Sequence, residues 1–175
     1  VGMSGKSNFL NSLICGLVRQ RSPDEIRFVL YDPKCVEFTD YYNLPHAAFQ
    51  VITDDAQCMY ALLSLVREMD RRLKMFVRVL CRRIDDFNKR KSETEEDGAP
   101  DIWGFKADES ADIQDTVPYI VFVIDEVAEL VARFGNDFIV PFKELMSKGS
   151  AAGIHVVTAT GFVYEQTLPP LLTDC

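Results

Sequence analysis

The first seven residues, Val-Gly-Met-Ser-Gly-Lys-Ser, match the end of a phosphate-binding P-loop. This motif reads G-x-x-x-x-G-K-[S/T], so its first glycine would stand one position before Val1. Backbone N–H groups of such a loop surround phosphate oxygens, its lysine reaches the β- and γ-phosphates, and its serine is a ligand of Mg²⁺. Apolar residues at helical spacing predict a helix over residues 8–20, with its N-terminus at the phosphates. The residues expected to bind ATP are Gly2, Met3, Ser4, Gly5, Lys6, Ser7 and Asn8, with Ser7 also binding Mg²⁺ and Lys6 also catalytic.

A second motif gives weight to the first, because G-K-S alone occurs by chance in many chains. Residues 119–124 are apolar and mostly β-branched or aromatic, which predicts a strand buried on both faces of a parallel sheet. The strand ends in Asp125 and Glu126, at the edge where open α/β sheets bind ligands. Asp125 has the position of a Walker-B aspartate, which holds Mg²⁺ through water. Glu126 can polarise the attacking water, which is typical of ATPases more than kinases. The alternative is that both acids only cap a helix over residues 127–134.

The other elements alternate between strand and helix, as a parallel α/β fold requires. We expect strands at 26–31, 49–53 and 154–160, a long amphipathic helix from about 55 to 84, and a helix at 137–148. His155 alternates within the last strand and is expected to pack in the core, while His46 lies in a loop. The sequence therefore predicts one α/β domain over residues 1–175, a mostly parallel sheet with helices on both faces.

The net charge of −8 is concentrated in one segment. Residues 92–117 hold nine acids and one lysine, and they lack hydrophobic periodicity, so we expect an acidic surface loop that Trp103 and Phe105 pin to the domain. Such a loop is usually only solvated, although it could also repel DNA from the wrong face. A basic stripe precedes it, and its members are Arg67, Arg71, Lys74, Arg78 and Arg82. This stripe is interpreted as a solvated face with i,i+4 pairs such as Glu68–Arg72, or else as a subunit or DNA-phosphate contact.

The composition favours a cytosolic domain. Hydrophobic residues make up 47% of the chain, yet no apolar run approaches the ~20 residues of a membrane span. The five cysteines show no metal-binding spacing, so we expect reduced thiols rather than zinc ligands or disulfides.

The ordered motifs together resemble the motor domain of the FtsK/SpoIIIE family. They are G-K-S, F-V-L-Y-D-P-K-x-x-E-F, N-L-P-H, V-I-T-D, E-M-D-R-R, P-Y-I-V-F-V-I-D-E-V-A-E-L and A-A-G-I-H-V-V. The resemblance implies a RecA-like fold and a hexameric ring that moves along double-stranded DNA at the expense of ATP, in chromosome segregation and cell division. It implies phosphate and Mg²⁺ binding by Lys6 and Ser7, a Walker-B role for Asp125 and a catalytic role for Glu126. It also implies a fragment of a longer protein, anchored through a segment absent here to the bacterial inner membrane, with the motor on the cytoplasmic side.

The chain departs from the family pattern at two positions. Ser150 stands where the family usually has arginine, and Gly161 stands where it has a glutamine that senses the γ-phosphate. These departures keep open a second interpretation, an FtsK/SpoIIIE-type ATPase of a protein secretion system or a degenerate ATP-binding ring module. A P-loop kinase or an unrelated nucleoside triphosphatase is a third. The segment Asp32-Pro33-Lys34, with Glu37, matches a family motif to which the sequence assigns no role.

Overall fold

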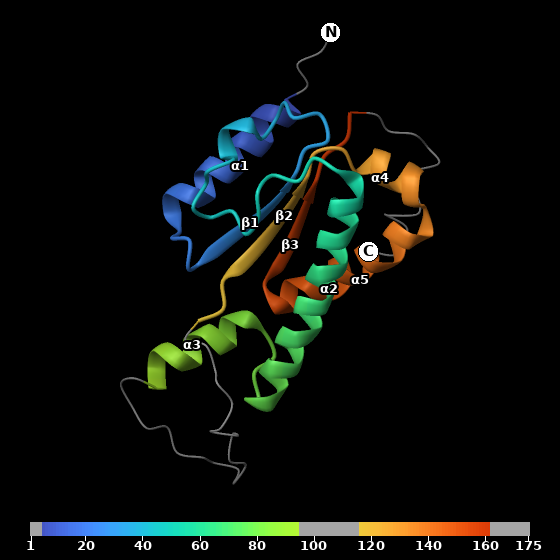
Figure 1. The fold of residues 1–175 in the computed structure, drawn as a ribbon. Coiled ribbons are helices and arrows are strands. Elements are labelled where there is room, and N and C mark those ends of the chain that lie inside the picture. Colours follow the sequence, from blue (N-terminus) through green and yellow to red (C-terminus); the bar gives the residue numbers. More distant parts are fainter. Residues whose placement is uncertain (1–4, 95–115, 162–175) are drawn as a thin grey trace.

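The computed structural model describes residues 5–94 and 116–161, and its centre is a three-stranded parallel sheet. The strands β1 (Ile26–Tyr31), β2 (Tyr119–Ile124) and β3 (Ile154–Thr158) lie side by side in that order (Figure 1). In the register of the sheet, Ile26 pairs with Tyr119 and Ile120 pairs with Ile154. The strand β2, which the two acidic residues follow, is therefore the central strand of the described sheet.

Helices cover both faces of this sheet, as the sequence predicts. Helix α1 (Lys6–Gln20) packs on one face, and α2 (Asp55–Arg78), α4 (Val127–Phe134) and α5 (Asn136–Lys148) pack on the other (Figure 1). Helix α3 (Ile84–Thr94) lies beyond the starting ends of the strands, and short 3₁₀ turns span Thr39–Tyr41 (η1) and Gly149–Ala152 (η2). The α/β architecture is therefore confirmed.

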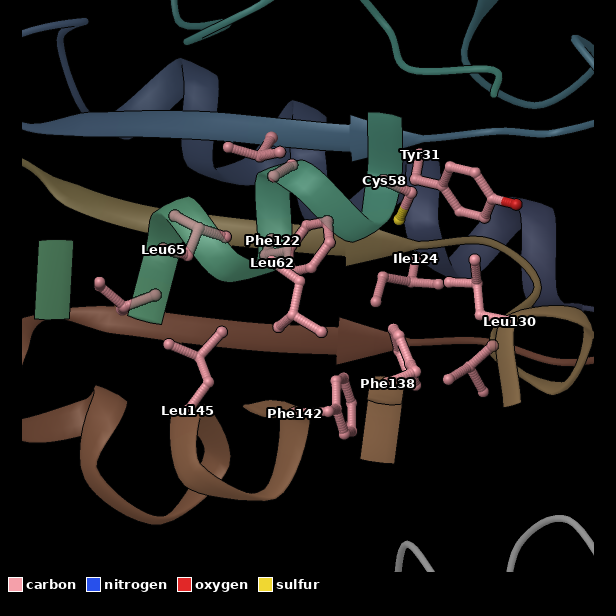
Figure 2. Close-up of a cluster of buried hydrophobic side chains, with 14 of the residues drawn as sticks. Tyr31, Cys58, Leu62, Leu65, Phe122, Ile124, Leu130, Phe138, Phe142 and Leu145 are labelled. Carbon is pink, nitrogen blue, oxygen red and sulfur yellow. The ribbon is translucent and has the colours of Figure 1, made fainter. Parts of the chain in front are cut away.

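The core divides into two layers because strand residues alternate between the faces. Val29, Tyr31, Phe122 and Ile124 face α2, α4 and α5, where Figure 2 shows Phe122 and Ile124 among side chains from these helices. The strand residues that alternate with these face α1, and they are Phe28, Leu30, Val121 and Val123. A strand that is buried on both faces must be apolar throughout, which explains the uninterrupted apolar run before Asp125.

The predicted strand over residues 49–53 is wrong. Among the described residues, only isolated bridges join this segment to β1, one between Phe28 and Ala47 and one between Tyr31 and Ile52. The two bridges are three residues apart on β1 but five apart on the partner segment, so two extra residues loop out and interrupt the ladder. Phe49 lies in this loop and is exposed, although an apolar side chain there suggested a buried strand.

The long helix predicted from 55 to 84 ends early, at Arg78, and a separate helix, α3, begins at Ile84. Leu80 has φ +58°, and the N–H groups of Leu80 and Cys81 donate to the carbonyls of Val77 and Phe76. This is the Schellman hydrogen-bond pattern, which normally has glycine at the left-handed position. Because leucine occupies that position here, the sequence carries no stop signal and the apolar periodicity appears continuous.

His155 is exposed rather than packed in the core, so that prediction is wrong. β3 is an edge strand of the described sheet, and α1 covers the other strands on this face. The His155 ring stacks instead on Tyr119, with ring centroids 6.1 Å apart. A cavity of about 670 Å³ lies beside these two rings, between α1, α3 and the sheet.

The charged segments agree only in part with expectation. Helix α3 extends to Thr94, which is past the predicted start of the acidic loop at 92, and residues 95–115, including Trp103 and Phe105, lie outside the described residues. The stripe residues on α2 are exposed, and the Glu68–Arg72 ion pair is present at 2.8 Å. Arg72 itself is buried, so this pair does not belong to a solvated face.

Four of the five cysteines lie in the described part of the chain. Cys15 and Cys35 are exposed, Cys58 and Cys81 are buried, and all four are free thiols. No described helix is both long enough and apolar enough to cross a membrane.

Candidate nucleotide-binding site

The predicted site residues converge at the carboxyl ends of the three strands and the N-terminus of α1. Lys6, Ser7 and Asn8 form the first turn of α1, and Gly5 is its N-cap with nothing within 4 Å of an added Cβ. The first turn of a helix has N–H groups without an intrahelical partner and carries the positive end of the helix dipole. The other predicted loop residues, Gly2, Met3 and Ser4, lie outside the described residues.

Lys6 and Asp125 form the central contact of the site. The Lys6 ammonium lies 2.8 Å from Asp125 Oδ1 and donates to the Asp125 main-chain carbonyl at 3.2 Å. Asp125 is only 1% exposed. Burial raises the pKa of the Asp125 carboxyl, the positive charge of Lys6 counteracts this rise, and Glu37 and Asp32 add to it. The structure therefore joins the P-loop lysine to the end of the Walker-B strand, 119 residues away in sequence.

The Asp-Pro-Lys segment after β1 completes one side of the site. Asp32 is fully buried and accepts hydrogen bonds from the N–H groups of Lys34, Glu37 and Phe38 at 3.2, 2.8 and 3.0 Å. These bonds fold the loop back over the end of the strand. Glu37 then accepts a 2.7 Å hydrogen bond from the Ser7 hydroxyl. Sequence reasoning assigned no role to this segment, although its position directly after a buried parallel strand was a signal of a site residue.

Glu126 is held by groups from two other elements. The Thr160 hydroxyl donates to Oε1, and the Gly161 N–H donates to Oε2 at 2.9 Å. The Lys34 ammonium lies 3.7 Å from Glu126 Oε2 and 3.2 Å from Glu129 Oε1. Glu126 is the N-cap residue of α4, but its side chain makes no capping hydrogen bond. The interpretation of both acids as simple helix caps therefore fails.

The two positions that depart from the family pattern lie at opposite ends of β3. Gly161 follows the strand and contacts Glu126 through its main chain. Ser150 lies in η2, before the strand begins, and is exposed. The Gly161 substitution thus lies inside the site, whereas Ser150 lies away from it. His46 contributes nothing to the site: it is buried, and its Nε2 contacts the Arg21 carbonyl.

The oxygen atoms of the site suit a magnesium ion. Ser7 Oγ and the carboxylates of Asp125 and Glu37 are hard oxygen donors, and among the described residues the buried Asp125 Oδ1 has only the Lys6 ammonium beside it. Within residues 5–94 and 116–161, no three His, Cys, Asp or Glu side chains gather closely enough to hold a metal alone. Mg²⁺ usually takes one or two protein oxygens and completes its shell with phosphate and water, so the residues fit this ion.

The parallel sheet and the convergence of Lys6, Ser7 and Asp125 define a P-loop ATPase domain. The model of the FtsK/SpoIIIE family matches residues 2–169, and the chain belongs to this family. The chain is 36% identical over 168 residues to "DNA translocase FtsK" of Brucella melitensis biotype 1, covering 90% of this chain and 21% of the relative. It is 38% identical over 157 residues to the protein of the same name from Corynebacterium glutamicum, covering 90% of this chain and 16% of the relative. The chain therefore spans about a fifth of the length of these curated relatives.

Solved structures of a secretion ATPase and a conjugation coupling protein share the fold. The cytoplasmic domain of the type VII secretion ATPase EccC of Thermomonospora curvata aligns with a TM-score of 0.73 at 26% identity, covering 97% of this chain and 18% of that one. The pCW3 conjugation coupling protein TcpA, solved with ATPγS, aligns with a TM-score of 0.72 at 22% identity, with 98% and 44% covered. The second likeness shows the fold alone.

Proposed function

We propose that this chain is the ATP-hydrolysing motor of a double-stranded DNA translocase. The observation that carries the proposal is the contact of Lys6 with Asp125, beside Ser7 and Glu126, at the carboxyl edge of the sheet. Two charged groups from distant parts of the chain are held together there, one buried and one partly buried. Such an arrangement is typical of a site for a charged ligand rather than of a packed core.

In the proposed mechanism, the first turn of α1 and the Lys6 ammonium bind the triphosphate, together with Gly2, Met3, Ser4, Gly5 and Asn8. Ser7 and Asp125 would hold Mg²⁺, which would supply positive charge against the triphosphate. Glu126 orients the attacking water and accepts its proton. Lys6 leaves Asp125 for the phosphate in this scheme, which frees the carboxylate for the ion.

DNA is proposed as the polymer that the motor moves. The support is the similarity, at 36–38% identity, to relatives named DNA translocase. The full protein would act as a hexameric ring around the duplex, in chromosome segregation and cell division. Its motor would lie on the cytoplasmic side of the bacterial inner membrane, to which another part of the protein would anchor it.

The alternative is an FtsK/SpoIIIE-type ATPase that moves protein, or a degenerate ATP-binding module of a ring. The 26% identity to the type VII secretion ATPase EccC and the replacement of the expected glutamine by Gly161 favour this alternative. Glu126, Asp125 and Lys6 are all present, which favours hydrolysis over ATP binding alone.

Three substitutions test the nucleotide chemistry, with binding measured by calorimetry and turnover by phosphate release. Lys6→Ala should abolish Mg·ATP binding, because the triphosphate loses its main counter-charge. Glu126→Gln should bind ATP and fail to hydrolyse it, since an amide cannot accept the proton. Asp125→Asn should weaken binding only when Mg²⁺ is present. Equal ATP affinity in the wild type and Lys6→Ala would refute the assignment of the site.

The choice between DNA and protein as the polymer needs the assembled full-length ring. Contacts to a polyanion go mainly to phosphates, so long duplex DNA should stimulate ATP hydrolysis, and added salt should weaken the effect steeply. Single strands should stimulate less. A ring that hydrolyses ATP but does not respond to long duplex at low salt would favour the protein-moving alternative.

A further inference from the structure

Lys34 bridges two carboxylates that belong to different parts of the site. Its ammonium lies 3.7 Å from Glu126 Oε2 and 3.2 Å from Glu129 Oε1, one turn further along α4. Glu126 is buried and Glu129 is half-exposed, so Lys34 connects the interior of the site to its surface. This places a cation beside the group that is proposed to accept the proton of water.

The loop that carries Lys34 is fixed from beneath. The buried Asp32 carboxylate accepts three main-chain N–H bonds from the loop, one of them from Lys34 itself. The loop also contacts the first turn of α1 through the Glu37–Ser7 hydrogen bond. The backbone of Lys34 is tied down in this way, which fixes the point from which its side chain reaches toward Glu126.

The main chain that follows β3 also contacts the Glu126 carboxylate. The Gly161 N–H contacts both carboxylate oxygens, at 2.9 and 3.2 Å, and the Thr160 hydroxyl contacts Oε1. A Cβ at position 161 would lie 3.2 Å from Glu126 Oε2, which is a tight approach. The glycine therefore lets the backbone close on the carboxylate, and the Gly161 N–H and the Lys34 ammonium both lie near the same oxygen, Oε2.

We propose that Lys34 is a positioning residue for Glu126: it holds the carboxylate against the Gly161 N–H and thereby sets its place at the end of β2. The inference rests on the proposed function of Glu126 and adds a residue to it. Hydrolysis should depend on Lys34 while ATP binding should not, because Lys6 and Ser7 bind the phosphate and Mg²⁺. The role belongs to the Glu126 contact and not to the ion pair with Glu129.

The test compares four variants of the full-length protein. Lys34→Met should lower kcat roughly tenfold, as small misplacements of catalytic groups do, and should leave the Kd for Mg·ATP within about twofold of the wild type. Lys34→Arg should recover most of the rate, because it restores a cation. Lys148→Met is the matched control: Lys148 is also half-exposed and pairs with one glutamate, Glu144, but lies at the end of α5. Glu129→Gln breaks only the other end of the Lys34 bridge and should not reproduce the loss.

A second measurement is independent of turnover. In hydrogen exchange of the nucleotide-free protein, the peptide that contains Gly161 should exchange faster in Lys34→Met than in Lys148→Met. Glu126→Ala removes the carboxylate that accepts the Gly161 N–H, so it gives the largest increase in exchange expected for this peptide. The inference is overturned if kcat of Lys34→Met is unchanged or raised, if the Gly161 peptide keeps its protection, or if Glu129→Gln loses as much activity. The proposed function fails separately, when the wild type neither binds nor hydrolyses ATP or when Lys6→Ala still binds it.

Discussion

Replacing Arg72 by methionine should destabilise the domain far more than a typical change of a charged helix residue. Arg72 is 2% exposed, although it belongs to α2 and its neighbour Arg71 is exposed. Its Nη1 donates to the carbonyls of Pro118 and Ala152, at 2.8 and 3.0 Å, and its Nε donates to Glu68. One guanidinium thus ties α2 to the residues just before β2 and β3.

The size of the loss in unfolding free energy follows from the groups that would lose a hydrogen-bond partner. Each hydrogen bond from a charged donor contributes about 1.5–3 kcal/mol, and a buried carbonyl left without a donor also loses its solvation. Part of this loss of stability is offset, because the methionine variant no longer buries a positive charge when it folds. The cost of burying that charge is visible in the pKa of Arg72, which burial lowers. Methionine keeps most of the apolar contacts of the arginine stem. The net loss should be about 3 kcal/mol, a large share of the ~5–15 kcal/mol that stabilises a domain.

Urea unfolding followed by circular dichroism measures this loss as a shift in midpoint at unchanged slope. Arg71→Met is the matched control, because Arg71 forms two hydrogen bonds to the same Glu68 carboxylate but is exposed and contacts neither carbonyl. It should cost about 1 kcal/mol or less, as exposed ion pairs do. If Arg72→Met costs no more than Arg71→Met, then water replaces the guanidinium at both carbonyls and the reasoning is refuted.

Three further predictions concern the glycines, the thiols and pH. Gly153→Ala should destabilise the folded domain by about 2–4 kcal/mol, because φ is +74° and the new Cβ would lie 2.2 Å from Ile84 Cδ1. Gly16→Ala, in the open middle of α1, should instead stabilise the domain by about 0.5–1 kcal/mol. Equal unfolding midpoints of the two variants would contradict this. Maleimide should label Cys35 in the folded protein but not Cys58, since burial removes access to the Cys58 thiol and raises its pKa; mass spectrometry detects the difference. Burial by itself would raise the pKa of Glu68, but its two arginine partners hold it below its ordinary value. The stability from that carboxylate is therefore present above its unfolded pKa of about 4.3 and lost as pH falls through the lower folded value, a loss that Glu68→Gln should not show in acid unfolding.

The regular elements could be predicted because local patterns determine them. Residues 26–31 and 119–124 are strands with the predicted bounds, since a six-residue run rich in β-branched and aromatic residues favours a buried strand over a helix. The helix at 127–134 also has its predicted bounds, and it ends at Gly135. The α/β fold and the meeting of Lys6 with Asp125 follow from these elements, because carboxyl ends of parallel strands share one edge of the sheet.

Other features depended on contacts between residues far apart in sequence. The turn at Leu80 has a left-handed conformation without a glycine, and nothing in the local pattern indicates it. The segment around Phe49 has the composition of a strand, but two looped-out residues break its pairing with β1. Whether His155 is buried depends on which helix covers the edge of the sheet, and that is decided by packing rather than by periodicity.

The residues that surround Glu126 show the same division. The sequence by itself identified the two acids and the P-loop lysine, because their spacing and their place after a strand are local properties. The positions of Lys34, Gly161 and Glu37 against the site were decided only by the tertiary structure. Their roles depend on distances between the ends of separate strands, which the arrangement of the sheet determines and no local pattern encodes.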